Sequence, residues 1–250
     1  LKAANPASRT VTIAGKDRAA VMMTGRGADQ RWYWDGKAWA TDLVGRPTPR
    51  AIVALNRVFA AQLAAPQPAL VPPKLCAAKA RSYAMTPTLA VGSGTLARAA
   101  GDARFVRASP QFDGAVLAGA AALTNELRLG RGKATDVLAV GLSATDYVGH
   151  AYGSGGQEMC LQMLALDREL GDFLARLDSS RVDYAVVLTA DHGGMDIPER
   201  LRDQGVPTAA RADPALAASE LGKLLAPQFG RQAPVLRGDG IGGDIWLDGD

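Results

Sequence analysis

The 250-residue chain has only two cysteines and two histidines, and aromatic residues make up 6% of it. Cys76 and Cys160 belong to no CxxC or Cys/His cluster, which argues against a structural zinc site. Their positions leave open whether they are two buried thiols or one disulfide. No apolar run reaches the roughly 18 residues of a membrane-spanning helix, so we expect no membrane span.

Net charge is also low, at a formal value of +3. Lys and Arg are scattered rather than gathered in a stripe, so the sequence predicts no nucleic-acid-binding surface. The length and a hydrophobic share of 48% suffice for a substantial core, in one large domain or one domain with insertions. The chain begins at Leu1 without an initiator Met or a signal-peptide pattern, which favours a start inside a longer protein.

Apolar runs and helical periodicity predict an α/β fold. Residues 10–14 alternate and are β-branched, as in a short strand. Residues 136–142 and 184–189 are continuous apolar runs, typical of strands covered on both faces. Between them, residues 157–177 have the spacing of a long amphipathic helix. The order strand, helix, strand predicts a right-handed βαβ unit and therefore a parallel sheet.

Two further helices and a hairpin are indicated. Residues 49–65 and 109–127 have helical character, each with a proline near its start. Residues 32–39 predict a hairpin with its turn at Asp-Gly. Three of the four tryptophans lie there, and we interpret them as a local aromatic core rather than a substrate-stacking surface. The apolar stripe of the 157–177 helix is predicted to comprise Cys160, Met163, Leu164, Leu170, Phe173, Leu174 and Leu177.

Both histidines lie just after predicted strands, and each has an aspartate close before it. Asp146 and His150 follow the first of these strands, and Asp191 and His192 follow the second. Ligands of open parallel sheets bind beyond the carboxyl ends of the strands, so we expect the four side chains to meet there. Carboxylate oxygen and imidazole nitrogen are suitable zinc ligands. One Asp-His pair is usually a surface pair, but two pairs that use every histidine favour metal ligation.

These motifs resemble those of a known superfamily. Asp146-x-x-Gly-His150 and Thr189-Ala-Asp-His-Gly-Gly194 look like the metal motifs of the alkaline phosphatase superfamily. The best-fitting branch includes the type I phosphodiesterases, the nucleotide pyrophosphatases and the monomeric bacterial alkaline phosphatases. Gly15-Lys-Asp-Arg-Ala19 resembles the Lys-x-Arg phosphate clamp of the bacterial phosphatases that use a threonine nucleophile. The Trp-Tyr-Trp-Asp-Gly segment and Ser109-Pro-x-Phe-Asp113 are similar to that group as well.

The resemblance implies a mostly parallel sheet flanked by helices, with inserted cap or crown segments. It divides the chain into a core strand piece at 1–15 and a cap or crown insertion with the phosphate clamp at 16–104. An α/β metal-binding core at 105–200 and a second insertion or cap at 201–250 follow. The whole would be a fragment of one larger catalytic domain.

The chemistry that the resemblance implies is zinc-dependent phosphate monoester hydrolysis through a covalent phosphoenzyme. Lys16 and Arg18 would be catalytic and hold the substrate phosphate, Arg as a fork and Lys as a point charge. Two Zn²⁺ ions per active site are implied, with other divalent metals possible. Their ligands in this chain would be Asp146 and His150 for one ion, and Asp191 and His192 for the other. Phosphorylated small-molecule substrates, a monomer and a periplasmic or secreted location are also implied.

Two parts of the family pattern are missing. There is no third histidine, and no Asp and Thr/Ser nucleophile motif precedes Lys16. Two catalytic zinc sites need roughly six protein ligands, whereas the motifs supply four. Asp196, Glu199 and Asp244 have no spacing that recommends them as substitutes. We therefore expect an internal fragment without appreciable phosphatase activity of its own when zinc is added.

Two alternative functions stay open at this point. A phosphodiesterase or nucleotide pyrophosphatase would share both metal motifs. Lys16 and Arg18 favour the monoester, because a dianionic terminal phosphate calls for more positive charge than a diester does. The alternative of another class is a non-catalytic metal- or phosphate-binding module, since a fold does not guarantee the chemistry.

Overall fold

A computed structural model describes residues 1–87, 89–238 and 243–248. It separates into two compact units, Leu1–Ile197 and Pro198–Asp250, and we describe each by itself. The four-part division expected from the resemblance stays a prediction. Within the first unit, residues from 30 to 64 supply two strands and a helix to the same core as the strand at the beginning of the chain.

The first unit is built on a four-stranded sheet with the strand order β3-β2-β1-β6. The central strand β1 (Thr10–Ala14) pairs in parallel with β2 (Gln30–Trp34) on one side and with β6 (Val137–Gly141) on the other. β3 (Trp39–Ala40) returns antiparallel to β2 and completes the predicted hairpin. The predicted fold class, a mostly parallel sheet flanked by helices, is confirmed.

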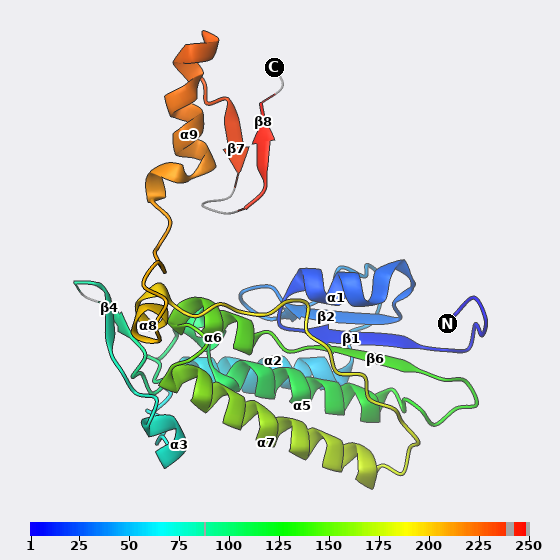
Figure 1. Ribbon diagram of the computed structural model, residues 1–250. Coiled ribbons are helices and arrows are strands. Elements are labelled where there is room, and N and C mark those ends of the chain that lie inside the picture. The colour runs from blue at the N-terminus through cyan, green and yellow to red at the C-terminus, as the bar shows by residue number, and fades with distance from the viewer. Residues whose placement is uncertain (88, 239–242, 249–250) are drawn as a thin grey trace. The chain divides into compact units, whose positions relative to one another are not determined.

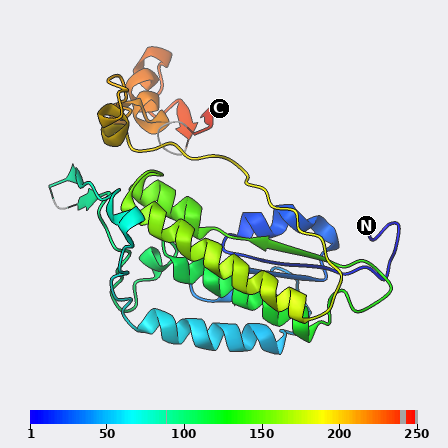
Figure 2. The same ribbon diagram turned by 60° about the horizontal axis from the view of Figure 1, so that its bottom comes forward.

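Helices cover both faces of this sheet (Figures 1 and 2). α1 (Asp17–Thr24) packs on one face, against β1, β2 and β6. On the other face α5 (Pro110–Glu126) contacts β1 and β6, with α2 (Arg50–Ala64) and α7 (Gln157–Ser179) packed on its sides. α2, α5 and α7 lie where the sequence predicts helices, whereas the sequence predicts no helix over α1. The site described below therefore rests on a three-layer α/β scaffold.

Shorter elements connect these parts of the first unit. They are the 3₁₀ turn η1 (Gly25–Gly27), α3 (Lys74–Ala77), the hairpin of β4 (Tyr83–Thr86) and β5 (Leu89–Val91), α4 (Ala103–Val106) and α6 (Ala144–Tyr152). Cys76 on α3 and Cys160 on α7 form a disulfide with a Cα–Cα distance of 5.4 Å, which resolves the alternatives left open by the sequence. No helix in the described ranges combines the length and the apolar character needed to cross a membrane.

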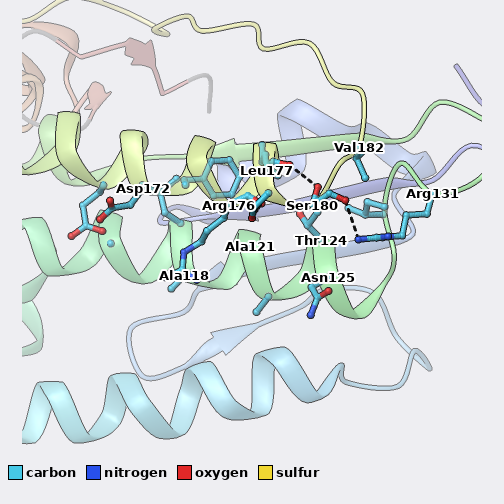
Figure 3. Close-up of a pocket in the computed structure, with 17 residues that line it drawn as sticks. Ala118, Ala121, Thr124, Asn125, Arg131, Asp172, Arg176, Leu177, Ser180 and Val182 are labelled. Atoms are coloured by element: carbon cyan, nitrogen blue, oxygen red, sulfur yellow. Dashed lines mark hydrogen bonds between the residues drawn. The ribbon is translucent and has the colours of Figure 1, made fainter.

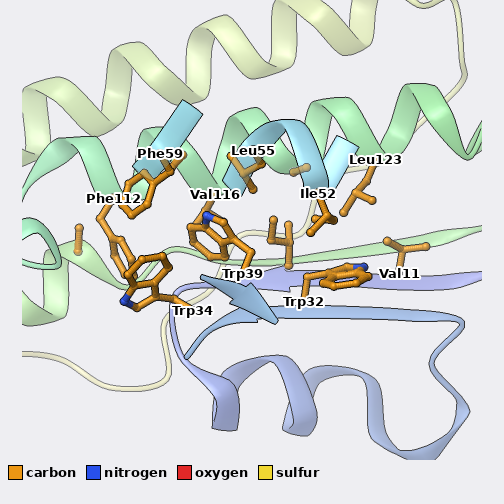
Figure 4. Close-up of a cluster of buried hydrophobic side chains, with 14 of the residues drawn as sticks. Val11, Trp32, Trp34, Trp39, Ile52, Leu55, Phe59, Phe112, Val116 and Leu123 are labelled. Atoms are coloured by element: carbon orange, nitrogen blue, oxygen red, sulfur yellow. The ribbon is translucent and has the colours of Figure 1, made fainter. Parts of the chain in front are cut away.

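The core of the first unit lies between the sheet and helices α2 and α5 (Figure 4). Trp32, Trp34 and Trp39 are all buried in it, as predicted for a local aromatic core. Trp34 meets Phe59 edge-on at a ring-centroid distance of 5.0 Å, and Trp39 stacks on Phe112 at 5.8 Å. Such geometry adds roughly 0.5–1.5 kcal/mol per pair beyond burial. The hairpin tryptophans therefore join the edge of the sheet to α2 and α5.

The strand predicted over residues 184–189 is wrong. In the structure these residues form no strand, and the side chains of Val187 and Leu188 are 90% and 80% exposed. The predicted βαβ unit built on that strand is absent with it, and the parallel pairing of the sheet comes from β1 and its neighbours. A strand needs a neighbour for its backbone hydrogen bonds, and no described strand pairs with this apolar run.

The predicted stripe of α7 is also partly wrong. Met163 and Leu164 are exposed, whereas Leu161, Gln162 and Ala165 are buried. The helix has turned a partly polar face inward, because the buried Gln162 and Glu158 have hydrogen-bond partners there. Apolar periodicity alone cannot reveal such a face.

The second unit is small. It contains α8 (Pro198–Asp203), the 3₁₀ turns η2 (Pro214–Leu216) and η3 (Ala226–Phe229), α9 (Ala218–Leu225), and the antiparallel pair β7 (Leu236–Gly238) and β8 (Ile245–Leu247). α9 packs on β7.

Candidate active site

The carboxyl ends of β1 and β6 lie side by side because the two strands are parallel and in register. β1 is followed by Gly15 and Lys16, and β6 leads into α6. The backbone N–H of Gly15 donates to the carbonyl of Gly141 at 2.9 Å, which ties the two strand ends together. Segments far apart in the sequence thus begin at one edge of the sheet, as expected for a ligand site of an open parallel sheet.

Gly15 is required by this close approach. A Cβ atom at this position would lie 2.6 Å from Cε1 of Phe112 and 2.9 Å from Cβ of Ser143. Both neighbours are buried, Phe112 in the aromatic core and Ser143 at the start of α6. Any larger residue would push apart β1 and the start of α6.

Asp146 and His150 lie on one face of α6, one helical turn apart. Their separation of four residues places them as neighbours, with Nε2 of His150 3.4 Å from Oδ1 of Asp146. The sequence predicts that both follow a strand, but it does not predict that a helix holds them. The helix fixes their spacing more firmly than a loop would.

His192 reaches the same carboxylate from the extended segment that follows α7. Its Nε2 atom is 3.4 Å from Oδ1 of Asp146. Asp191 lies beside it, with Oδ2 3.7 Å from Nε2 of His192, but its side chain is 88% exposed. The structure therefore brings Asp146 and both histidines together and leaves Asp191 at the margin.

Lys16 completes the group, because its ammonium forms an ion pair with Oδ2 of Asp146. The same ammonium lies over the ring of Tyr147, 4.8 Å from the centroid. Arg18 is exposed on the first turn of α1. Within the described ranges no contact of its guanidinium to Asp146 or to the histidines is present. We call Lys16, Asp146, His150 and His192 the Asp146 cluster.

Charge within the cluster favours the ionised form of Asp146. Burial by itself would raise the pKa of this carboxyl, but the Lys16 ammonium and the two imidazoles together hold its pKa below the ordinary value. The pKa of His192 is raised, first by its hydrogen bond to the carbonyl of Gly193 and then by Asp191 and Asp146. The cluster thus presents a carboxylate whose charge is already balanced by a cation.

The chemistry of these donors fits a divalent metal ion, because carboxylate oxygen and imidazole nitrogen both ligate zinc. The arrangement differs from that of a ready-made site. Over residues 1–87, 89–238 and 243–248, no group of three or more His, Cys, Asp or Glu side chains stands in a geometry that would hold a metal. One oxygen of Asp146 faces Lys16 instead. The donor types therefore fit, whereas their number and spacing are those of part of a site.

Comparison with known proteins identifies the family. Residues 10–221 match the profile of the type I phosphodiesterase / nucleotide pyrophosphatase family. The chain belongs to this family. The superfamily and branch predicted from the motifs are confirmed.

The relatives of this type I phosphodiesterase family member include alkaline phosphatases. Alkaline phosphatase PhoK of Sphingomonas sp is 45% identical over 250 residues, which are 99% of this chain and 44% of that protein. Alkaline phosphatase PhoD of Zymomonas mobilis is 44% identical over 234 residues, covering 92% of this chain and 40% of that protein. The chain thus spans less than half the length of these curated relatives.

A solved structure of the same kind supports the fold. The crystal structure of wild-type alkaline phosphatase PafA matches with a TM-score of 0.78 and 25% identity, covering 99% of this chain and 49% of the PafA chain. The match extends over nearly the whole chain, so the α/β scaffold of this family member agrees with an experimentally determined one.

A sizeable cavity of this family member lies away from the Asp146 cluster (Figure 3). It has a volume of about 560 Å³ and lies between α5 and α7, with Arg131 and Ser180 at one end. Arg131 donates there to the carbonyl of Ser180 at 3.3 Å. None of the residues predicted for the site lines this cavity. The cavity and the Asp146 cluster therefore have no residue in common.

Sequence reasoning missed three residues beside the cluster. Tyr147 contacts the Lys16 ammonium, and the Arg107 guanidinium lies 5.0 Å from the centroid of the same ring. Asp113 is buried beneath the first turn of α6 and accepts the N–H of Ala144 at 2.9 Å. The segment that contains Asp113 is conspicuous in the sequence, but nothing there says that its carboxyl reaches another helix.

Proposed function

We propose that the protein is a zinc-dependent phosphate monoester hydrolase that acts through a covalent phosphoenzyme. The observation that carries the proposal is the convergence of Lys16, Asp146, His150 and His192 at the carboxyl edge of the sheet. Relatives named alkaline phosphatase, at 44–45% identity, support it. The phosphoenzyme rests on the likeness of the Lys16–Arg18 segment to phosphatases with a threonine nucleophile.

The proposed metal ligands are the two Asp/His pairs, Asp146 with His150 and Asp191 with His192. Bound divalent ions would supply Lewis-acid stabilisation of the charge that develops on phosphate oxygens. In this chain the cationic neighbours of Asp146 outweigh its partial burial and lower its pKa, which favours the carboxylate form that a metal ion needs. The imidazoles are the usual nitrogen donors for such ions.

Lys16 and Arg18 are the proposed phosphate-binding residues. They stand at the N-terminal end of α1, where the positive end of the helix dipole also favours an anion. Lys16 is already desolvated, with 12% of its side chain exposed, which strengthens its attraction for a phosphate. Arg18 is exposed and offers a fork for two phosphate oxygens.

The test uses the protein as its own gene encodes it. Chelation with EDTA should abolish hydrolysis of p-nitrophenyl phosphate, and added Zn²⁺ should restore it. Lys16→Ala and Arg18→Ala should each lower kcat/KM on the order of 10²-fold, the cost of removing one preorganised charge partner. Lys37→Ala and Arg26→Ala are the matched controls, because both side chains are exposed and lie elsewhere. Equal losses in the controls, or activity that survives EDTA, would contradict the proposal.

A phosphodiesterase is the second candidate, favoured by the description of the matching family. Both readings use the same metal ligands, so the substrate decides between them. We expect kcat/KM for p-nitrophenyl phosphate to exceed kcat/KM for bis(p-nitrophenyl) phosphate. Lys16→Ala should reduce the ratio of these two values. A higher value for the bis-ester would overturn the monoester assignment. Binding of Zn²⁺ or phosphate without any turnover would instead indicate the non-catalytic module.

We further propose a periplasmic or secreted location, phosphorylated small molecules as substrates and a monomeric state. The Cys76–Cys160 disulfide supports the location, because such bonds form and persist in oxidising compartments.

A further inference from the structure

Two polar side chains are buried together beneath the Asp146 cluster. Asp113 of α5 is 1% exposed and Gln162 of α7 is completely buried. Nε2 of Gln162 donates to Oδ2 of Asp113 at 3.2 Å. Buried carboxyl groups are costly unless they are hydrogen-bonded, so the contacts of this pair show what it does.

The pair holds the first turn of α6. Oδ1 of Asp113 accepts the N–H of Ala144 at 2.9 Å. The neighbouring N–H groups of Ser143 and Thr145 also favour the charged form of this carboxyl and act to lower its pKa. Nε2 of Gln162 lies 3.5 Å from Oγ1 of Thr145. The first turn of α6 is thus clamped between α5 and α7.

This helix has no cap of its own. Ser143 occupies the N-cap position, but its side chain makes no capping hydrogen bond. The first N–H groups of a helix have no partner within the helix and need an acceptor, above all when they are buried. Asp113 supplies that acceptor from a different helix, and Asp146 is the next residue along the chain after Thr145.

We propose that Asp113 is a positioning residue that fixes the first turn of α6 and thereby places Asp146 for metal binding. The inference rests on the proposed function, since it concerns the proposed metal ligand. Asp113 itself does not touch the cluster. It acts through the backbone of residues 143–145, supported by Gln162.

The charge of Asp113 is not what this role requires. An asparagine keeps the Oδ1 acceptor for the N–H of Ala144. Its new amide donor would replace Oδ2 and face Nε2 of Gln162, which is also a donor. Turning the Gln162 amide by 180° would present Oε1 instead, which is buried and has no hydrogen-bond partner among the described residues. A leucine has the same branched skeleton with two bulkier methyl groups in place of the oxygens; it removes every acceptor and leaves the N–H groups of the turn unsatisfied.

The test compares Asp113→Asn, Asp113→Leu and Gln162→Leu in the protein as its gene encodes it. Zn²⁺ affinity is measured by chelator competition, and kcat and KM are measured with p-nitrophenyl phosphate as substrate. Both measurements are made at a temperature where every variant is folded. We expect Asp113→Leu to weaken Zn²⁺ binding about tenfold or more, the usual cost of losing an outer-shell support. Gln162→Leu should have a smaller effect, and Asp113→Asn should stay within about threefold of wild type.

Leu123→Ala is the matched control, because Leu123 is equally buried on α5 and belongs to the core rather than to the α6 contact. It should lower thermal stability and leave Zn²⁺ affinity unchanged. If Asp113→Leu lowers thermal stability but leaves Zn²⁺ affinity unchanged, as expected for Leu123→Ala, Asp113 is only a structural residue and the proposal is wrong. If Asp113→Asn is as damaging as Asp113→Leu, the charge matters and the capping argument fails.

Amide hydrogen exchange of residues 143–146 separates this inference from the proposed function. The measurement needs no metal and serves even where Asp113→Leu is poorly folded, because Asp113→Asn and Gln162→Leu can be compared. Gln162→Leu should speed exchange in this turn, and Asp113→Asn should not. Unchanged exchange in Gln162→Leu would overturn the clamp. A wild-type protein without Zn²⁺ binding or turnover would refute the proposed function and leave the exchange result standing.

Discussion

At the scale of single residues, the site depends on how closely two strand ends can approach. Gly15 has no side chain, and this absence lets Ser143 and Phe112 pack against the backbone just before Lys16. The ion pair of Lys16 with Asp146 then bridges the two segments that follow the strands. One glycine therefore sets the distance between the proposed phosphate-binding lysine and the proposed metal ligands.

Gly15→Ala tests this directly. The added methyl group would meet a core aromatic and the start of α6, neither of which can yield cheaply. We expect a loss of about 1–3 kcal/mol in the free energy of unfolding, the usual cost of overpacking, together with lower kcat/KM. Urea unfolding and p-nitrophenyl phosphate kinetics, both on the protein as its gene encodes it, provide the two measurements.

Gly171→Ala is the control for this substitution. Gly171 lies within α7 and a Cβ atom there would meet nothing within 4 Å. Alanine should stabilise the helix by about 0.5–1 kcal/mol and leave the kinetics unchanged. If Gly15→Ala and Gly171→Ala change the free energy of unfolding in the same direction, the close approach at Gly15 is not the cause of the effect of Gly15→Ala.

At the scale of elements, sequence periodicity predicts the scaffold well and its polar contacts poorly. The helices at 50–64, 110–126 and 157–179 and the strand at 137–141 agree with the predicted ranges within a few residues. Their signals are local, because apolar spacing and proline position belong to each segment by itself. The apolar run at 184–189 fails because strand formation depends on a neighbour that the segment cannot encode.

In the candidate site, too, the sequence predicts part of the arrangement and misses its polar contacts. Asp146 and His150 lie beyond the carboxyl end of β6, as the rule for parallel strands predicts, and His192 contacts the same carboxylate. His192 arrives on an extended segment rather than from the predicted strand, so that rule does not explain its position. The support by Asp113 could not be foreseen. A carboxyl that caps a different helix leaves no spacing pattern, whereas a cap from within the same helix would.

The cap of α6 has a pH dependence that can be measured. Burial raises the pKa of Asp113 to about 7, against the opposing hydrogen bonds of the α6 backbone and Gln162, whereas an ordinary Asp titrates at 3.8. Between these values the folded chain holds a proton that the unfolded chain has lost. The free energy of unfolding should therefore fall as pH rises from about 4 to 7, and this group should have no further effect above 7. The whole difference corresponds to about 4 kcal/mol.

Asp113→Asn cannot titrate, so urea unfolding of wild type and variant across pH 4.5–8 isolates the effect. The stability of wild type relative to the variant should decline up to pH 7 and then level off. Asp136→Asn is the control. Burial alone would raise the pKa of Asp136, but the Arg9 guanidinium and the backbone N–H groups of Gly130 and Arg9 together lower it, so the contribution of Asp136 should be constant over this range. A difference between wild type and Asp113→Asn that does not change with pH would contradict the raised pKa.

At the scale of the whole molecule, the sheet and the helices on both its faces carry the site, and one covalent link joins distant parts of the chain. Cys76 lies on the short helix α3, and Cys160 lies near the start of α7, two residues before Gln162. The bond closes a loop across a sequence separation of 84 residues. It connects the segment between α2 and α4 to the helix that supports the Asp146 cluster.

Removal of this link should destabilise the chain through its unfolded state. In the chain-entropy model a loop of this length corresponds to about 4–5 kcal/mol, and native disulfides commonly contribute roughly 2–5 kcal/mol. We expect the double variant Cys76→Ser/Cys160→Ser to lose stability in this range, measured by denaturant unfolding. Dithiothreitol should shift the unfolding midpoint of the wild type towards that of the variant and leave the variant unaffected. A wild-type midpoint that is insensitive to reduction under unfolding conditions would mean that the two thiols are not joined in the protein, and would remove the support that the disulfide gives to an oxidising location.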